Sequence, residues 1–359
     1  MKIKTYGEAQ VIMSNPGGKH NYFGWPTATR LQNGKIAVVA SGFRLRHVCP
    51  FGKTVISYSE DEGKTYTLPA PVIDTVLDDR DGGIMTFGKS GVIVTSFNNA
   101  VSFQRKIAGE EPYRNAYLDT VTEEEEKAAV GSTFRISNDC GVTFGPIHKS
   151  PVTTPHGPIE LKDGTILYVG RKFTDKNAQT TDDCVMAYTI NPEDGSMQYL
   201  STIENVLPEL KPLSCEPDII ELDDGRILCH IRVEKQGDDR RFTIFQCESD
   251  DKGKTWTTPH QIIGDTAGAP AHLFKHSSGM LISTYGYRTA PFGIRAMFSE
   301  DGGKTWDADY DVYVNNVSWD IGYPSTVELS DGSMLTMFYA HKSESEPAVI
   351  MQQKWSFEK

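Results

Sequence analysis

The chain has 359 residues, with 48 Asp and Glu against 36 Lys and Arg, and a formal net charge of −12. This acidic balance disfavours a nucleic-acid partner, because a polyanion repels a protein of the same charge. A content of 38% hydrophobic residues, 32 glycines and 15 tyrosines is typical of a globular protein rich in strands and turns. The length fits either two or three domains or one large repeat architecture.

The amino terminus, "MKIKTYGEAQ", has no apolar run that could form a signal peptide or a membrane span. We therefore expect a cytoplasmic protein with no membrane partner. Six cysteines occur without a CxxC pair, and we interpret them as reduced thiols rather than disulfides or metal ligands. A Walker loop, an HExxH motif and a dinucleotide fingerprint are all absent, so we expect no cofactor and no metal.

A hairpin pattern, in which a turn residue and a glycine precede an alternating apolar run, occurs six times along the chain. The turn glycines are Gly34, Gly91, Gly164, Gly225, Gly279 and Gly332, separated by 53 to 73 residues. Each interval has room for about four short strands. The pattern predicts an all-β fold, a six-bladed β-propeller with four-stranded antiparallel blades, as one domain over residues 1–359. "GEAQVIM" near the amino terminus is expected to complete the last blade as an edge strand.

A second motif, S-x-D-x-G-x-T-aromatic, occurs four times, as "SEDEGKTY", "SNDCGVTF", "SDDKGKTW" and "SEDGGKTW". It resembles the Asp-box (BNR) repeats of the sialidase superfamily, where the box folds the turn between the two outer strands of a blade. Ser and Asp side chains can bond the turn backbone, Gly can take the left-handed conformation, and the aromatic ring can pack between blades. We expect a structural role for these aspartates.

Residues 99–130 do not fit the repeat and form a predicted insertion in the second blade. Within them, "DTVTEEEEKAA" predicts a short capped helix. The insertion is expected to be a wall of the site, a subunit contact or a solvated loop.

Residues at equal distances from the turn glycines are expected to meet at the propeller axis. The residues about nine positions before the glycines, within one position, are Trp25, Asp81, His156, Glu216 and Tyr323. The arginines seven to ten positions after the glycines are Arg44, Arg171, Arg232 and Arg288. Guanidinium groups bind carboxylates, sulfates and phosphates through paired hydrogen bonds. The ring therefore predicts a site for an anionic ligand.

The resemblance to sialidases extends to individual residues of this ring. Sialidases have a glutamate sixteen residues before an arginine, as Glu216 precedes Arg232, and a tyrosine in a Gly-Tyr-small context that matches Tyr323. The resemblance implies that Tyr323 is the nucleophile and Glu216 its base, since sialidases are the tyrosine exception among glycoside hydrolases.

Two positions depart from the sialidase pattern. Gly24 in "FGWP" stands where the Phe-Arg-Ile-Pro motif has its carboxylate-binding arginine, and His47 stands at about the spacing of the acid aspartate. The general acid is left open between His47, His156 and Asp81, because an imidazole titrates near neutral pH. A third arginine, shortly before the fifth-blade box, is either Arg288 or Arg295.

These features favour an exo-acting glycoside hydrolase that releases a terminal acidic sugar with retention of configuration. The sugar would be a sialic acid, a related keto-acid or a uronic acid. The alternatives are a propeller-type polysaccharide lyase that acts on uronates and a non-catalytic carbohydrate-binding propeller. The residues expected to bind the carbohydrate are Arg232, Arg171, Arg44, Arg288, Arg295, His156 and Trp25.

Overall fold

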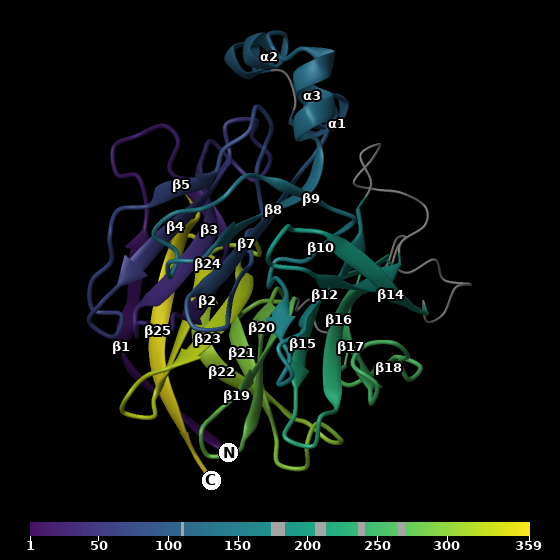
Figure 1. Ribbon diagram of the computed structural model, residues 1–359. Helices are drawn as coiled ribbons and strands as arrows, with labels where there is room; N and C mark the ends of the chain where they lie inside the picture. Colours follow the sequence, from purple (N-terminus) through teal and green to yellow (C-terminus); the bar gives the residue numbers. More distant parts are fainter. Residues whose placement is uncertain (109–110, 174–183, 205–212, 236–240, 265–269) are drawn as a thin grey trace.

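Six antiparallel sheets surround one axis in a computed structural model of the chain (Figure 1), which describes residues 1–108, 111–173, 184–204, 213–235, 241–264 and 270–359. Inner strands of neighbouring sheets contact one another around the axis, and the first strand of the last sheet contacts that of the first. The ring is therefore closed, and the predicted six-bladed β-propeller is confirmed. No helix in these ranges is long and apolar enough to cross a lipid bilayer.

Blades 1 to 3 follow the chain from residue 22 to residue 203. Blade 1 contains β2 (Tyr22–Arg30), β3 (Ile36–Arg44), β4 (Lys53–Ser59) and β5 (Ala70–Ile73). Blade 2 contains β6 (Ile84–Phe87), β7 (Gly91–Asn98), β8 (Gly131–Ser137) and β9 (His148–Ser150). In blade 3 the inner strand is divided into β10 (Val152–Thr153) and β11 (Ile159–Glu160), which both pair with β12 (Ile166–Lys172); β13 (Val185–Ile190) and β14 (Met197–Ile203) follow.

Blades 4 to 6 complete the ring. Blade 4 contains β15 (Leu213–Glu221), β16 (Ile227–Lys235), β17 (Arg241–Ser249) and β18 (His260–Gln261). Blade 5 contains β19 (Ala271–Lys275), β20 (Leu281–Tyr287), β21 (Phe292–Ser299) and β22 (Asp307–Asn316). Blade 6 contains β23 (Gly322–Glu328), β24 (Met334–Ala340), β25 (Val349–Glu358) and, as its outermost strand, β1 (Lys2–Met13).

The amino-terminal strand closes the last blade, as the sequence predicted. β1 pairs antiparallel with β25, and Val11 lies opposite Met351 in the register. The two ends of the chain therefore belong to the same sheet and lie close together in Figure 1. Apolar clusters lie between neighbouring blades; one of them packs Val38 of blade 1 against Met337 of blade 6, and both side chains are fully buried. Burial between blades therefore stabilises the ring as a whole.

The predicted turns are present in detail. Five of the six turn glycines have φ between 77° and 88°; in blade 2 the left-handed residue is Gly88 instead, and Gly91 begins β7. In each Asp box the Ser hydroxyl accepts a hydrogen bond from the Gly amide and the Asp carboxylate accepts from the Thr amide, as in Ser299, Asp301, Gly303 and Thr305. The boxes lie between the third and fourth strands of blades 1, 2, 4 and 5, and Trp306 reaches Gln246 of the neighbouring blade. Their predicted structural role is confirmed.

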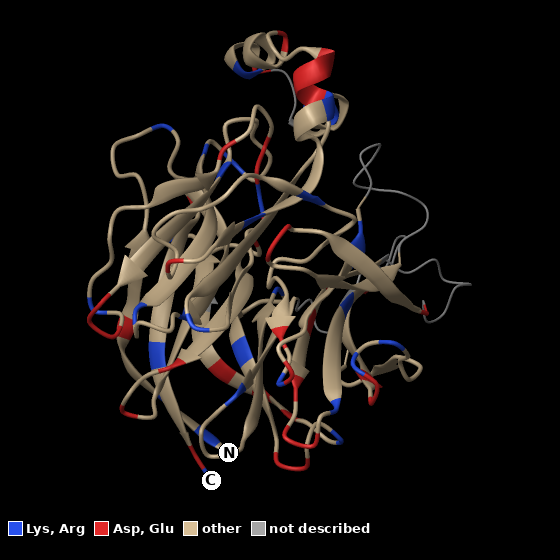
Figure 2. Ribbon diagram, in the orientation of Figure 1, with Lys and Arg blue, Asp and Glu red and all other residues tan. Residues whose placement is uncertain are grey.

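The insertion between β7 and β8 contains three short helices: α1 (Val101–Ala108), α2 (Pro112–Leu118) and α3 (Glu123–Ala129). They stand together at one end of the propeller in Figure 1, and Figure 2 shows the acidic residues of α3. Thr122 caps α3 through a capping box with Glu125, as predicted. Residues 109–110 of the predicted insertion lie outside the described residues. All six cysteines are described, and no disulfide links them.

Candidate active site

A pocket of about 720 Å³ lies at the propeller axis, on the side of the insertion. All six blades contribute to its lining, and α1 adds the apolar side chains of Phe103 and Ile107. The insertion therefore forms part of the pocket wall, which is one of the three roles expected for it. The volume is that of a typical small-molecule site and would hold one or two sugar rings.

Three of the predicted residues form one hydrogen-bonded group in this pocket. The Tyr323 hydroxyl donates to Glu216 Oε1 over 2.5 Å, and Arg232 Nη1 donates to Glu216 Oε2 over 2.5 Å. The same arginine nitrogen lies 3.3 Å from the Tyr323 oxygen, and its Nη2 lies 3.3 Å from Glu234. A buried arginine therefore fixes the carboxylate that receives the phenol proton in a hydrogen bond.

The proton of this group resides on the phenol at neutral pH. Burial, followed by the negative charge of Glu216, raises the pKa of Tyr323 well above its ordinary value, and Arg232 only partly opposes this. Burial also favours the neutral form of Glu216, but Arg232, the hydrogen bond from Tyr323 and the charge of Arg288 outweigh it, so its pKa is lowered. The carboxylate is ionised and placed to accept the phenol proton.

A strained backbone conformation directs these side chains to the axis. Trp25, Asp81, Glu216 and Tyr323 have φ between 49° and 53°, a left-handed conformation that bulky residues rarely adopt. Register irregularities occur at three of these places, where β2, β15 and β23 pair with the next strand. A bulge turns the side chain away from the regular alternation, and each left-handed residue costs about 1–3 kcal/mol.

The pocket is rich in positive charge although the protein is acidic. Four arginines line it, against two carboxylates. The arginines are Arg80, Arg171, Arg232 and Arg288, and the carboxylates are Asp81 and Glu216. The formal charge of the lining is therefore +2, which favours an anionic ligand.

Arg80 is a site residue that the sequence reasoning missed. Its guanidinium stacks 4.4 Å from the Trp25 ring and makes ion pairs of 3.6 Å with Asp81 and 3.9 Å with Asp78. Among the described residues the Arg80 guanidinium makes these two ion pairs and no hydrogen bond, and its Nε is buried without a hydrogen-bond partner. Its position next to Asp81 in "DDRDGG" was a usable signal. Arg80 thus adds a cation to the pocket, whereas Gly24 stands where the sialidase pattern has an arginine.

Arg288, rather than Arg295, belongs to the pocket. Its Nε donates to the Ile321 carbonyl over 2.8 Å and its Nη2 to the Tyr339 hydroxyl over 2.9 Å, which holds the side chain beside Tyr323. Arg295 instead pairs with Asp309 and Asp311 on the outer part of blade 5. Of the two arginines between which the sequence left the choice open, Arg288 lines the pocket and Arg295 does not.

Asp81 is a buried carboxyl group on the pocket wall. Burial raises its pKa to about 6; the positive charge of Arg80 opposes this, and the negative charge of Glu216 adds to it. Its Oδ1 has no hydrogen-bond partner among the described residues. Asp81 therefore holds a proton at a pH where Glu216 does not, an arrangement typical of an acid and a base that share a site.

His47 lies at the rim, where its side chain is 45% exposed. Its Nδ1 is 3.4 Å from Asp320, a carboxylate that also accepts hydrogen bonds from the Tyr22 and Tyr339 hydroxyls. Asp320 was not predicted, nor was the neighbouring Trp319, whose ring is 59% exposed at the pocket. Both precede Tyr323 by a few residues, and the exposed tryptophan could have been suspected from "SWDIGYP".

Three other predicted residues do not line the pocket. Arg44 is fully buried and pairs with Asp78, and Trp25 is buried beneath Arg80 and Arg44, so neither reaches a ligand directly. His156 points instead into a deeper cluster on the axis. We therefore correct the expectation of direct ligand binding for these residues: Arg44 and Trp25 support the pocket from below.

A family model described as a BNR repeat-like domain matches residues 117–337, more than half of the chain. The chain belongs to the BNR repeat-like domain family. The match includes Glu216, Arg232, Arg288 and Tyr323. No curated protein matches this BNR protein in sequence.

Solved structures share the fold of this BNR protein at low identity. A protein of unknown function from Dyadobacter fermentans is 19% identical, with a TM-score of 0.78 over 99% of both chains. The NanB sialidase from Streptococcus pneumoniae, as its K499G mutant, is 15% identical, with a TM-score of 0.65 over 97% of this chain and 70% of that one. An α-L-arabinanase from Penicillium chrysogenum, solved with arabinobiose, is 12% identical, with a TM-score of 0.62 over 98% of both chains. At these identities the likeness establishes the fold, which sialidases and an arabinanase share, and no activity.

Proposed function

We propose that this protein is an exo-acting glycoside hydrolase that releases a terminal anionic sugar, with Tyr323 as the nucleophile. The observation that carries the proposal is the 2.5 Å hydrogen bond from the Tyr323 hydroxyl to an ionised Glu216 in a pocket with four arginines. The fold shared with a sialidase and an arabinanase supports a glycoside as the substrate class. A sialic acid, a related keto-acid or a uronic acid would each supply the anion.

In the first step, Glu216 accepts the phenol proton while the Tyr323 oxygen attacks the anomeric carbon; the glycosidic C–O bond breaks, and the departing oxygen takes a proton from the general acid. A neutral phenol approaches a sugar carboxylate with less repulsion than a second carboxylate would. Arg232 contacts both the base and the phenol oxygen, so it stabilises the charge that develops on either. Water then hydrolyses the glycosyl–tyrosine bond, and the configuration at the anomeric carbon is retained.

The sugar carboxylate would lie between Arg80 and Arg288. Arg80 lines the pocket and makes no side-chain hydrogen bond among the described residues, and Arg288 is held in place by Ile321 and Tyr339. Asp81 is the acid that we favour for the departing oxygen, because its raised pKa keeps a proton available near pH 6. His47, oriented by Asp320, is the competing acid.

The test uses purified protein on fluorogenic aryl glycosides of neuraminic, ketodeoxynonulosonic and glucuronic acid, with a rhamnoside as the neutral comparison. We expect release from an acidic glycoside, loss of release in Tyr323→Phe, and unchanged release in the control Tyr313→Phe on blade 5. A fluorinated analogue of the active sugar should leave its mass on the peptide that contains Tyr323. Release that persists in Tyr323→Phe would refute the tyrosine mechanism.

Substrates with different leaving groups separate the two candidate acids. Loss of the true acid should abolish cleavage of natural glycosides but spare activated aryl glycosides, whose leaving groups need no proton. We expect this pattern in Asp81→Asn and a uniform, smaller effect in His47→Gln. An unsaturated product that absorbs in the ultraviolet, without hydrolysis, would establish a lyase instead, and binding without turnover would establish a carbohydrate-binding propeller.

A further inference from the structure

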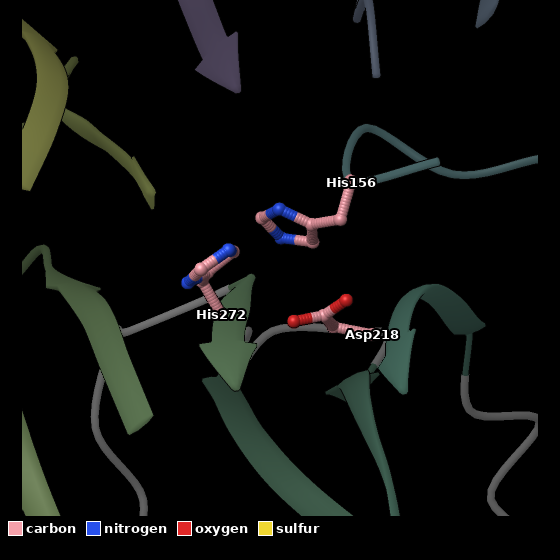
Figure 3. Close-up of side chains that lie close together, drawn as sticks. All are labelled: His156, Asp218 and His272. Carbon is pink, nitrogen blue, oxygen red and sulfur yellow. The ribbon is translucent and has the colours of Figure 1, made fainter. Parts of the chain in front are cut away.

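Below the catalytic pocket, three side chains from consecutive blades meet at the axis. His156 precedes β11 in blade 3, Asp218 lies on β15 in blade 4, and His272 lies on β19 in blade 5. One imidazole nitrogen of each histidine and one carboxylate oxygen all lie within 4.8 Å of one another. Figure 3 shows the two rings and the carboxylate facing a common space.

His156 has no hydrogen-bond partner that would explain its position. It is 5% exposed, and among the described residues neither ring nitrogen finds a donor or an acceptor. Its contact with His272 is a tilted one between rings 5.4 Å apart. A buried imidazole without partners costs free energy, and such a group normally indicates a ligand that satisfies it.

Asp218 is a buried carboxyl group without a cationic partner. It is 6% exposed, its Oδ2 accepts a 2.6 Å hydrogen bond from the Leu273 amide, and no cationic side chain among the described residues pairs with it. A carboxylate at this depth normally has a cation beside it. His272 Nδ1 accepts a hydrogen bond of 3.3 Å from the Thr326 amide. This weak bond would be given up when either nitrogen of the ring binds a metal ion.

We propose that His156, Asp218 and His272 bind one divalent transition-metal ion at the propeller axis, with Zn²⁺ as the best match. Two imidazoles and one carboxylate are a common ligand set for zinc, with ligand distances of about 2.0–2.2 Å. Atoms that coordinate one ion at this distance lie closer together than the 4.8 Å within which these three atoms are found, so small side-chain rotations would accompany binding. The sequence did not indicate this site, because the three residues are 54 to 62 positions apart and match no local motif.

The ion would act on the structure of the pocket rather than on the sugar. Asp218 follows Glu216 by two residues on β15, so an ion held here would fix the inner strands of three blades beneath the Tyr323–Glu216 pair. None of the three ligands lines the catalytic pocket. The proposal is therefore independent of the proposed hydrolase activity.

The experiment titrates chelator-treated full-length protein with Zn²⁺ by calorimetry and measures bound metal by mass spectrometry after dialysis. We expect one zinc per chain in wild type and in the control His260→Gln, an exposed histidine on β18. His156→Gln and Asp218→Asn should each weaken binding by more than the roughly 10- to 100-fold lost with an outer-shell partner. Two variants are used so that a folding defect in one leaves the other informative.

Co²⁺ provides a second readout that excludes the cysteines. Cobalt bound by two histidines and a carboxylate gives visible d–d absorption without the intense near-ultraviolet thiolate band. We expect this spectrum in wild type and His260→Gln, and its loss in folded Asp218→Asn, as judged by circular dichroism. Wild type that binds no Zn²⁺ or Co²⁺, binding that survives in both ligand variants, or a thiolate spectrum would each overturn the proposal.

Discussion

Replacement of Asp81 by asparagine is expected to stabilise the protein at neutral pH while it removes the proposed acid. Asp81 is 4% exposed, has an ordinary pKa of 3.8 and a folded-state pKa of about 6, which burial raises most. The ionised side chain is thus unfavourable in the fold even beside Arg80, 3.6 Å away. Asparagine has almost the same shape and never ionises.

The magnitude follows from the difference of about 2 pKa units between folded and unfolded chains. At about 1.4 kcal/mol per unit, this amounts to about 3 kcal/mol. Because the folded-state pKa is raised, the tighter binding of the proton stabilises the fold fully below pH 3.8 and is lost as the pH rises through about 6. Above that pH, Asp81→Asn should exceed wild type by up to about 3 kcal/mol in free energy of unfolding, and the two should converge near about pH 4.

The assay is chemical denaturation followed by tryptophan fluorescence, at a series of pH values from about 4 to about 8. Subtraction of wild type cancels the titration of every other buried carboxyl group. Asp250→Asn, at an exposed position of an Asp box, should give a difference that does not depend on pH. An Asp81→Asn variant that loses stability equally at all pH values would show that Asp81 is a favourably paired carboxylate, and its role as the acid would fall with that result.

Three further substitutions test the pocket and the scaffold. Arg80→Lys should raise KM for the acidic glycoside by about 10-fold with little change for a neutral one, because lysine lacks the planar donor pair of arginine; steady-state kinetics on both substrates measures this. Trp319→Ala should raise KM with kcat unchanged, since a 59% exposed ring can stack on a sugar in ground and transition states alike; an equal fall in kcat would contradict this. Asp301→Ala removes the acceptor of the Thr305 amide (2.9 Å) and hydroxyl (2.7 Å) and should cost about 1–3 kcal/mol of stability by denaturation while activity stays unchanged.

Local sequence patterns predicted most of the fold. The turn glycines and Asp boxes act through short-range hydrogen bonds and left-handed dihedrals, which the residue types determine almost alone. Closure by β1 was predictable because an unpaired edge strand remains after six hairpins are counted. The divided inner strand of blade 3 was not, since β10 and β11 flank the segment that carries His156, and tertiary contacts decide its course.

The candidate site was predictable only where the hairpin geometry repeats. Counting from the glycines placed Glu216 and Tyr323 together. In blade 2, where the left-handed turn residue is Gly88 rather than Gly91, Asp81 was found one position away from the count. Arg80 and Asp320 were missed because they lie in connecting segments, where no periodicity relates sequence to position. Arg44 was counted correctly along the chain, yet its pairing with Asp78 buries it.

The left-handed residues connect the scaffold to the proposed chemistry. In a regular strand, successive side chains point to alternate faces of the sheet. The register irregularities after Cys215 in β15 and after Gly322 in β23 break this alternation and direct the side chains of Glu216 and Tyr323 into the pocket. Gly322, at φ 136° with its Cα against Gly286, provides the close approach that permits the bend before Tyr323. Since each such residue costs about 1–3 kcal/mol, four of them in one ring form an arrangement that packing alone does not favour. Asp81, Glu216 and Tyr323 of this ring line the pocket, so the strained backbone holds the side chains that the proposed mechanism uses.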